Sequence, residues 1–203
     1  MDAFISLTGT AVPLLQDDIN TDQIAPADRS HGHGADMKAT LFSRWKAADP
    51  NFVFNRPQFK EPRILVARDN FACGSSRESA VWAMAANGIR CVVARSIADI
   101  FKENCLRNGV LTIELPKDKA EAFEDKVTKA DGAPKFTVDL PSQTITCPDG
   151  SKISFDVTPA EKTALLEGLD DIGITLKHKA DIEAYEAKIK KDKPWLQKAL
   201  AHQ

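Results

Sequence analysis

Three short apolar runs, separated by two segments of helical character, constrain the fold of this chain more than any other feature. The runs are RILVA (63–67), RCVVA (90–94) and VLTIEL (110–115), and each is rich in the β-branched residues that favour strands. The first intervening segment, SAVWAMAAN (79–87), has helical composition, and Gly88 is a natural residue to follow a helix.

The second intervening segment also predicts a helix. Ser96 and Asp99 have the spacing of a capping box, and Asn108-Gly109 supplies a stop signal. Strand, helix, strand, helix, strand over residues 63–115 is typical of parallel strands joined by crossover helices. We therefore expect an α/β fold.

The regions on either side have a different character. Residues 5–15 predict a strand, and residues 16–36, rich in Asp, Asn, Gly and Pro, predict an irregular exposed loop before a short helix near 41–47. After the third run the sequence predicts, in order, a helix near 119–129, alternating strands within 135–140 and 144–147, and a hairpin partner within 151–157.

The C-terminal quarter opens with Thr158, Pro159 and Glu161, which match the N-cap, first and third positions of a helix. Residues 168–178 predict a loop or a strand, and ADIEAYEAKIKK (180–191) predicts a charged amphipathic helix. We expect a single domain over residues 1–203, with its core at about 5–177 and a C-terminal helix and tail at about 178–203.

Bulk properties narrow the function class. The 203 residues are 43% hydrophobic, which is enough for a core, and the net charge of −2 argues against general nucleic-acid or acidic-membrane binding. No apolar run approaches the roughly 20 residues of a membrane span. The N-terminus lacks the basic and apolar regions of a signal peptide, so we expect a cytoplasmic protein.

The four cysteines match no metal-binding spacing. They are Cys73, Cys91, Cys105 and Cys147, and the expected state is four separate reduced thiols. We therefore expect this chain alone to hold no metal and no cofactor.

A polar segment, Gly74-Ser75-Ser76-Arg77-Glu78, stands between the first run and its helix. One interpretation is a capping box with Ser75 as N-cap and Glu78 at the third position. That leaves Arg77 unexplained, because a cation in the first turn opposes the helix dipole by a few tenths of a kcal/mol.

The other interpretation is an anion site. Amide groups at a helix start and a guanidinium both bind carboxylate or phosphate, and Gly74 lets the backbone approach closely. Both interpretations stay open. The segment matches neither the G-x-S-x-G elbow of serine hydrolases nor a P-loop.

Several longer motifs resemble a known family. NFACGSSRESAVWAM (70–84), CVVARSIADIFKENCLRNGVL (91–111), DDINTDQIAP (17–26), DPNFVFN (49–55) and LEGLDDIGITL (166–176) are similar to motifs of the small subunit of 3-isopropylmalate dehydratase, a swivel-domain relative of aconitase. The resemblance covers roughly residues 10–190. It implies an aconitase-like swivelling β/β/α domain, with a mixed sheet or barrel-like core and flanking helices.

The resemblance also implies an activity and a partner. Such a chain pairs with a separate large subunit, which carries the cysteine ligands of a [4Fe–4S] cluster. The heterodimer is a hydro-lyase that interconverts 2-isopropylmalate and 3-isopropylmalate by dehydration and rehydration in leucine biosynthesis.

Residue roles follow from the matching positions. Ser75 corresponds to the catalytic base, and Ser76 and Arg77 correspond to ligands of the substrate carboxylates. Thr21 and Asp22 correspond to the T-D signature near the reacting centre. A serine hydroxyl is a base only if its alkoxide is strongly stabilised, which Arg77 and the helix start can provide.

Two departures from the family pattern G-x-G-S-S-R-E-H lie beside the site: Ala72 replaces the first glycine and Ser79 replaces the histidine. A third is the loop ADRSHGHGAD (27–36), which replaces a more apolar stretch. Arg29, His31 and His33 are the loop's candidates for carboxylate contacts, unless the segment is merely solvated.

An isopropyl group needs an apolar wall, so this polar loop leaves an alternative open: a paralogous hydratase acting on maleate, citraconate, dimethylmaleate or a related diacid. A second alternative is a non-enzymatic carboxylate-binding module. The remaining expectations concern packing: Trp82, Met84 and Ile89 in the core, and the aromatic residues Trp45, Phe52 and Phe54 against the loop or a partner.

Overall fold

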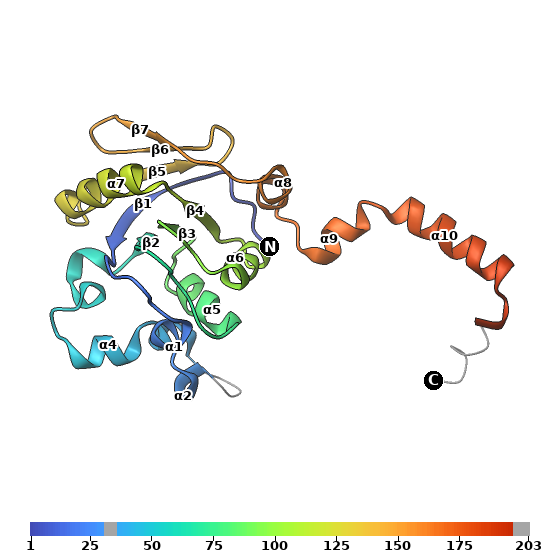
Figure 1. Ribbon diagram of the computed structural model, residues 1–203, viewed down its shortest axis with the longest axis horizontal. Helices are drawn as coiled ribbons and strands as arrows, with labels where there is room; N and C mark the ends of the chain where they lie inside the picture. The colour runs from blue at the N-terminus through green and yellow to red at the C-terminus, as the bar shows by residue number, and fades with distance from the viewer. Residues whose placement is uncertain (31–35, 197–203) are drawn as a thin grey trace. The chain divides into compact units, whose positions relative to one another are not determined.

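The three apolar runs form neighbouring strands of one sheet in the computed structural model, which describes residues 1–30 and 36–196 (Figure 1). The expectations for His31 and His33 lie outside the described residues. The strands are β2 (Pro62–Val66), β3 (Cys91–Ala94) and β4 (Leu111–Glu114), and they pair in parallel through the crossover helices α5 (Glu78–Ala86) and α6 (Asp99–Arg107). The predicted strand–helix alternation is confirmed.

The first strand joins this parallel layer to an antiparallel one. β1 (Ser6–Pro13) pairs in parallel with β2 on one side and antiparallel with β5 (Phe136–Asp139) on the other. β6 (Thr144–Thr146) and β7 (Lys152–Ser154) complete a seven-stranded sheet in the order β4-β3-β2-β1-β5-β6-β7. The expected mixed sheet with flanking helices is therefore confirmed.

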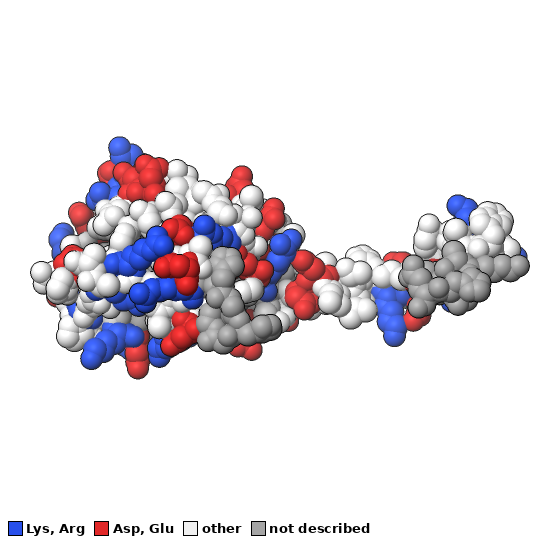
Figure 2. Space-filling model, turned by 90° about the horizontal axis from the view of Figure 1, so that it is seen from below, with Lys and Arg blue, Asp and Glu red and all other residues white. Residues whose placement is uncertain are grey.

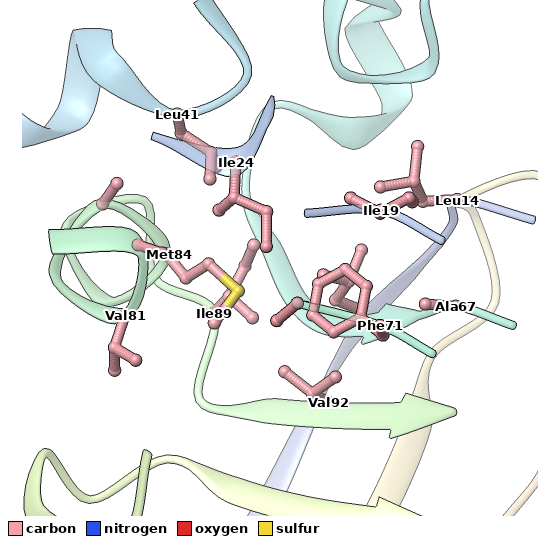
Figure 3. Close-up of a cluster of buried hydrophobic side chains, with 14 of the residues drawn as sticks. Leu14, Ile19, Ile24, Leu41, Ala67, Phe71, Val81, Met84, Ile89 and Val92 are labelled. Atoms are coloured by element: carbon pink, nitrogen blue, oxygen red, sulfur yellow. The ribbon is translucent and has the colours of Figure 1, made fainter. Parts of the chain in front are cut away.

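Alternation along the central strands divides the core into two clusters, one for each face of the sheet. Leu65 and Val92 pack with α5 and α6, whereas Ile64 and Val93 pack with α7 (Lys117–Ala130) and the antiparallel strands. In Figure 3, Met84 of α5 extends toward the other buried side chains of the first cluster. Each such side chain contributes about 1.5–3 kcal/mol relative to an exposed one.

Trp82 does not belong to this core, which corrects the sequence expectation. Its side chain is 45% exposed, while Val81, Ala83 and Met84 are fully buried. Successive residues of a helix point about 100° apart, so the face that places Val81 and Met84 inside turns Trp82 outward.

The segment before β2 is more structured and more buried than expected. It contains α1 (Thr21–Ile24), α2 (Ala27–Ser30), α3 (Met37–Thr40), α4 (Ser43–Ala48) and two 3-10 turns at Val53–Asn55 and Pro57–Phe59. Ile19 and Ile24 are buried, because the polar loop residues cap turns while these two apolar side chains reach the first core cluster. Phe42, Trp45, Phe52 and Phe54 form an aromatic group with ring centroids 4.9–5.8 Å apart.

The C-terminal part begins with α8 (Pro159–Glu167), whose predicted N-cap is confirmed: Thr158 Oγ1 accepts from the Glu161 amide. The helix ends at Gly168, where φ is +66°. The chain then divides into two compact units, residues 1–168 and 169–203. The sequence predicts the end of the core near residue 177, one short helix later.

The second unit contains α9 (Asp171–Leu176) and the expected final helix, α10 (Lys179–Asp192). The loop or strand predicted for 168–178 is wrong. Asp170 accepts a hydrogen bond from the Gly173 amide at 2.7 Å and so starts a helix, which outweighs the strand preference of Ile172 and Ile174. Among the described residues, no helix has the length and apolarity to cross a membrane.

Candidate active site

Two loops that are far apart in the sequence lie side by side at the start of α5. Asn20 and Cys73 form a parallel bridge, and the Thr21 amide donates to the Cys73 carbonyl at 3.0 Å. Thr21 Oγ1 donates to the Ser75 carbonyl at 2.8 Å. These bonds hold the T-D motif against the serine-arginine segment. The family resemblance alone implied that the two segments belong to one site.

The T-D motif is held by a capping box at α1. Asn20 Oδ1 accepts from the amides of Asp22 and Gln23, and Gln23 Oε1 accepts from the Asn20 amide at 2.7 Å. This reciprocal arrangement satisfies the donors at the helix start and fixes the turn. Asp22 therefore projects from a defined backbone.

Asp22 is the anion that stands beside Arg77. Arg77 Nη1 donates to Asp22 Oδ1, and Arg44 Nη1 donates to Asp22 Oδ2 at 3.0 Å. Arg44 also reaches Asp28 Oδ1 at 3.0 Å, so the four side chains form an alternating chain of charges. The hydrogen bond from Arg77, followed by that from the Ala27 amide, lowers the pKa of Asp22 below its ordinary value.

This pairing explains why an arginine is tolerated at the helix start. Arg77 is the N-cap residue of α5 without a side-chain cap, so the predicted capping box of Ser75 and Glu78 is wrong. Glu78 Oε1 instead accepts from Asn108 Nδ2 at 2.9 Å, which ties α5 to the end of α6. The α6 capping box is wrong as well, because Ser96 Oγ accepts from the Asn70 amide at 2.7 Å.

The loop before Ser75 follows an unusual backbone path. Asn70, Ala72 and Gly74 have φ of +56°, +59° and +91°. Alanine rarely adopts such angles, and at position 72 the family pattern has the glycine that adopts them readily. Gly74 remains a glycine, and this lets the chain turn into the exposed residues Ser75 and Ser76.

A cavity of about 270 Å³ opens beside these residues. Thr21, Gly74, Ser75, Ser76 and Arg77 line one side of it. The first turns of α6 supply the other side, with Ala98, Asp99, Ile100, Phe101 and Asn104. Its size suits a small ligand, and it combines hydroxyls, a guanidinium and an apolar wall.

Not every predicted residue reaches this cavity. Arg29 lies on α2 and is exposed, and His31 lies outside the described residues. Asp22 is one contact away, through Arg77. Arg44 was not predicted, because a single arginine in a short helix gives no sequence signal for a partner 22 residues earlier.

A buried carboxylate on α7 holds the backbone that follows β2 and β3 and leads into the site loop. Glu124 Oε1 accepts from Arg95 Nε at 2.9 Å, and Oε2 accepts from Arg95 Nη2 and Arg68 Nε, each at 3.0 Å. Arg68 and Arg95 follow β2 and β3, and the Glu124 side chain is 5% exposed. This Glu124 clamp therefore fixes the carboxyl ends of two parallel strands, where the site loop begins.

Charged side chains of both signs are mixed on the surface of the first unit (Figure 2). The face of the first unit seen in Figure 2 carries basic and acidic side chains close together, with no extended area of one sign. A larger cavity of about 640 Å³ lies at the opposite end of β2, beside Pro62 and Arg63, and none of the predicted site residues lines it. We therefore take the smaller cavity as the candidate site.

The cysteines and other metal-binding groups are dispersed. All four cysteines are free thiols in the structure, and burial raises the pKa of Cys105 well above its ordinary value. Within residues 1–30 and 36–196, no three His, Cys, Asp or Glu side chains are grouped so that they could hold a metal ion.

Comparison with known proteins identifies the family. Residues 1–118 match the aconitase C-terminal domain, 126–159 match a domain described as LeuD_N, and 171–199 match the C-terminal domain of the 3-isopropylmalate dehydratase small subunit. The 3-isopropylmalate dehydratase small subunit of Dinoroseobacter shibae is 43% identical over 97% of this chain and 100% of its own length. The chain belongs to the 3-isopropylmalate dehydratase small-subunit family. The small subunit of Paramagnetospirillum magneticum is 44% identical over the same shares.

A solved structure of this family has the same fold. The crystal structure of 3-isopropylmalate dehydratase from Methanocaldococcus jannaschii is 25% identical, with a TM-score of 0.64. The match covers 90% of this chain and 99% of that one. The family membership and fold expected from the sequence are thus confirmed, while the roles of individual residues remain predictions.

Proposed function

We propose that this chain is the small subunit of a cytoplasmic hydro-lyase that interconverts 2-isopropylmalate and 3-isopropylmalate in leucine biosynthesis. The observation that carries the proposal is the cavity in which Ser75, Ser76 and Arg77 stand together, in a chain that matches small subunits over nearly its whole length. The activity requires a large subunit as partner.

In this proposal Ser75 is the catalytic base. Dehydration removes a proton from one carbon and hydroxide from its neighbour, and Ser75 Oγ, as the alkoxide, would accept that proton. The peptide dipoles of α5 point their positive ends toward the start of the helix, which favours negative charge near Ser75. Arg77 adds a positive charge at the same place.

Ser76 and Arg77 would bind the substrate carboxylates, with Gly74 allowing close approach of the backbone. Asp22 occupies one N–H of Arg77, and a guanidinium has five, so the group can hold Asp22 and a substrate carboxylate together. Thr21 and Asp22 then act mainly by orienting the segment, since Thr21 binds the Ser75 carbonyl.

The [4Fe–4S] cluster belongs to the large subunit in this proposal, as the family resemblance implies. The dispersed cysteines of this chain do not form a ligand set for it. When bound in the partner, the cluster supplies Lewis-acid chemistry at the substrate hydroxyl. This chain contributes the proton acceptor and the carboxylate contacts.

The polar loop favours a second candidate function, that of a hydratase for maleate, citraconate or dimethylmaleate. The specific observation is that Asp28 joins the charge chain of the site through Arg44, next to the exposed Arg29. We propose Arg29 and His31 as carboxylate contacts that would act in the assembled enzyme.

The test is anaerobic reconstitution with the cognate large subunit, followed by ultraviolet absorbance of the conjugated double bond. Isopropylmalate should turn over faster than citraconate, maleate or dimethylmaleate, and the small subunit alone should be inactive. A preference for a smaller diacid would transfer the function to the second candidate.

A Ser75→Ala variant tests the base. We expect kcat to fall by about 10³-fold or more while the complex still assembles, because no other group takes the proton. Turnover at the wild-type rate would exclude Ser75 from that role. If no diacid turns over but one stabilises the lone chain in an Arg77-dependent manner, the chain is a carboxylate-binding module.

A further inference from the structure

The second unit carries most of the large apolar side chains that the described surface exposes. They are Ile172, Ile174, Leu176, Ile182, Tyr185, Trp195 and Leu196, with exposed fractions from 37% to 69%. No described residue of α9 or α10 is buried. We call residues 169–196 the C-terminal arm. The arm has apolar surface but no described core of its own.

The apolar residues of the arm follow helical spacing. Ile182, Tyr185 and Ile189 stand at i, i+3 and i+7 of α10 and therefore share one face, the apolar stripe. Ile172 and Leu176 stand at i and i+4 of α9. Residues 169–196 contain six acidic residues and six lysines, so the arm has no net charge. Such a pattern is typical of a helix that binds in an apolar groove.

The C-terminal arm is too short to bury its own apolar surface. A helix of 14 residues is marginal in water unless its apolar face is buried. α10 contains only about two heptads, fewer than the three to four heptads of apolar repeat that indicate a coiled coil. The sequence of α10 therefore does not indicate a coiled coil with a second copy of this chain.

The first unit exposes few large apolar side chains among its described residues. Its exposed large apolar residues are Ile5, Trp82 and Ile100, on three different segments, in the part of the chain that the structure describes. Its largest cavity is lined mostly by polar and charged side chains, including Lys60, Arg63 and Lys135. The three dispersed apolar residues do not make a continuous apolar surface.

We propose that the C-terminal arm docks on the large subunit, with the apolar stripe of α10 in an apolar groove of that partner. This inference rests on the proposed function, which supplies the partner. Aromatic side chains bury about 150–250 Å² each, so Tyr185 and Trp195, with the five exposed aliphatic residues of the arm, can supply much of the roughly 800 Å² that one partner contributes to a stable interface.

The experiment compares two double variants of the full chain. Ile182→Ser with Tyr185→Ser removes two residues of the apolar stripe. Glu183→Ser with Lys191→Ser is the matched control, because it makes two serine substitutions away from the stripe, keeps the net charge and replaces better helix formers. Circular dichroism checks that both variants fold.

Binding to the cognate large subunit is measured by calorimetry, and isopropylmalate turnover is measured at increasing large-subunit concentration. We expect the stripe variant to raise the Kd of the complex at least about 100-fold, with turnover restored at saturation. The control should stay within about threefold of wild type.

An unchanged Kd for the stripe variant would overturn the inference, and so would a turnover defect that persists at saturation. Loss of self-association of the lone chain, with unchanged binding of the large subunit, would assign the arm to a second copy instead. A tight, stripe-dependent complex without isopropylmalate turnover would refute the proposed substrate and leave the docking inference standing.

Discussion

At the scale of single residues, the ion pair between Asp22 and Arg77 makes stability depend on pH. Arg77 lowers the pKa of Asp22, so the folded state gains stability when Asp22 is ionised. That gain is complete above the ordinary pKa of an aspartate and is lost as pH falls through the lowered folded value.

Replacing Asp22 by asparagine should therefore lower the free energy of unfolding at pH 6, and the difference from wild type should shrink toward pH 3. We expect this loss of unfolding free energy to be under about 1 kcal/mol at pH 6, because the Asp22 side chain is 39% exposed. Urea unfolding at several pH values measures this. Asp28→Asn is the control, since Asp28 pairs with Arg44 and not with Arg77.

Gly74 allows a second prediction at this scale. Its φ of +91° is strained for any side chain, and a Cβ there would lie 3.5 Å from Asn20 Cβ without a clash. Gly74→Ala should lower the free energy of unfolding by about 1 kcal/mol. Gly150→Ala, at φ +82° with open space, should lower it similarly, but only the Gly74 variant should lose turnover. Equal turnover in both would show that the loop geometry does not matter.

At the scale of secondary-structure elements, the Glu124 clamp joins α7 to the ends of β2 and β3. Glu124→Ala leaves two arginines without their buried partner, so we expect about 2–3 kcal/mol of destabilisation. Glu121→Ala is the matched control on the same helix, because Glu121 is 53% exposed and lies 3.7 Å from Arg95. It should change the free energy of unfolding by less than about 0.5 kcal/mol. Similar losses in both variants would contradict a special role for the buried carboxylate.

The sequence predicts an element well when its hydrogen bonds are local, and poorly when its side chains bond to distant residues. The strands around Leu65 and Val92 and the capped helix at Thr158 follow from local patterns of apolar and capping residues, and these predictions are confirmed. The predicted caps at Ser75 and Ser96 are wrong because a side chain of each capping box bonds to a distant group: Glu78 to Asn108, and Ser96 to Asn70.

The candidate site shows the same contrast between local motifs and contacts of distant residues. The serine-arginine segment was visible as a motif, since its polar residues interrupt an apolar pattern. The path Asp28–Arg44–Asp22–Arg77 was not, because side-chain pairs between separate elements leave no periodic trace in one sequence.

At the scale of the whole molecule, the division after Gly168 predicts how the chain unfolds. Both core clusters and all seven strands lie in the first unit, and no described residue of α9 or α10 is buried. A chain that stops after Gly168 should therefore keep its free energy of unfolding within about 1 kcal/mol of the full chain. Thermal and urea unfolding measure this, and a larger loss would mean that the C-terminal arm stabilises the first unit.

A shorter chain that stops after Val157 is the control. It lacks α8 and with it Leu165, which is 2% exposed and whose carbonyl accepts from the Phe4 amide at 2.8 Å. The terminal ammonium of Met1 also donates to the Gly168 carbonyl at 3.1 Å. Losing a buried leucine and both contacts should lower the free energy of unfolding by about 2–5 kcal/mol. The two truncations together locate the boundary of the cooperative unit, because only the shorter one removes side chains that the core needs.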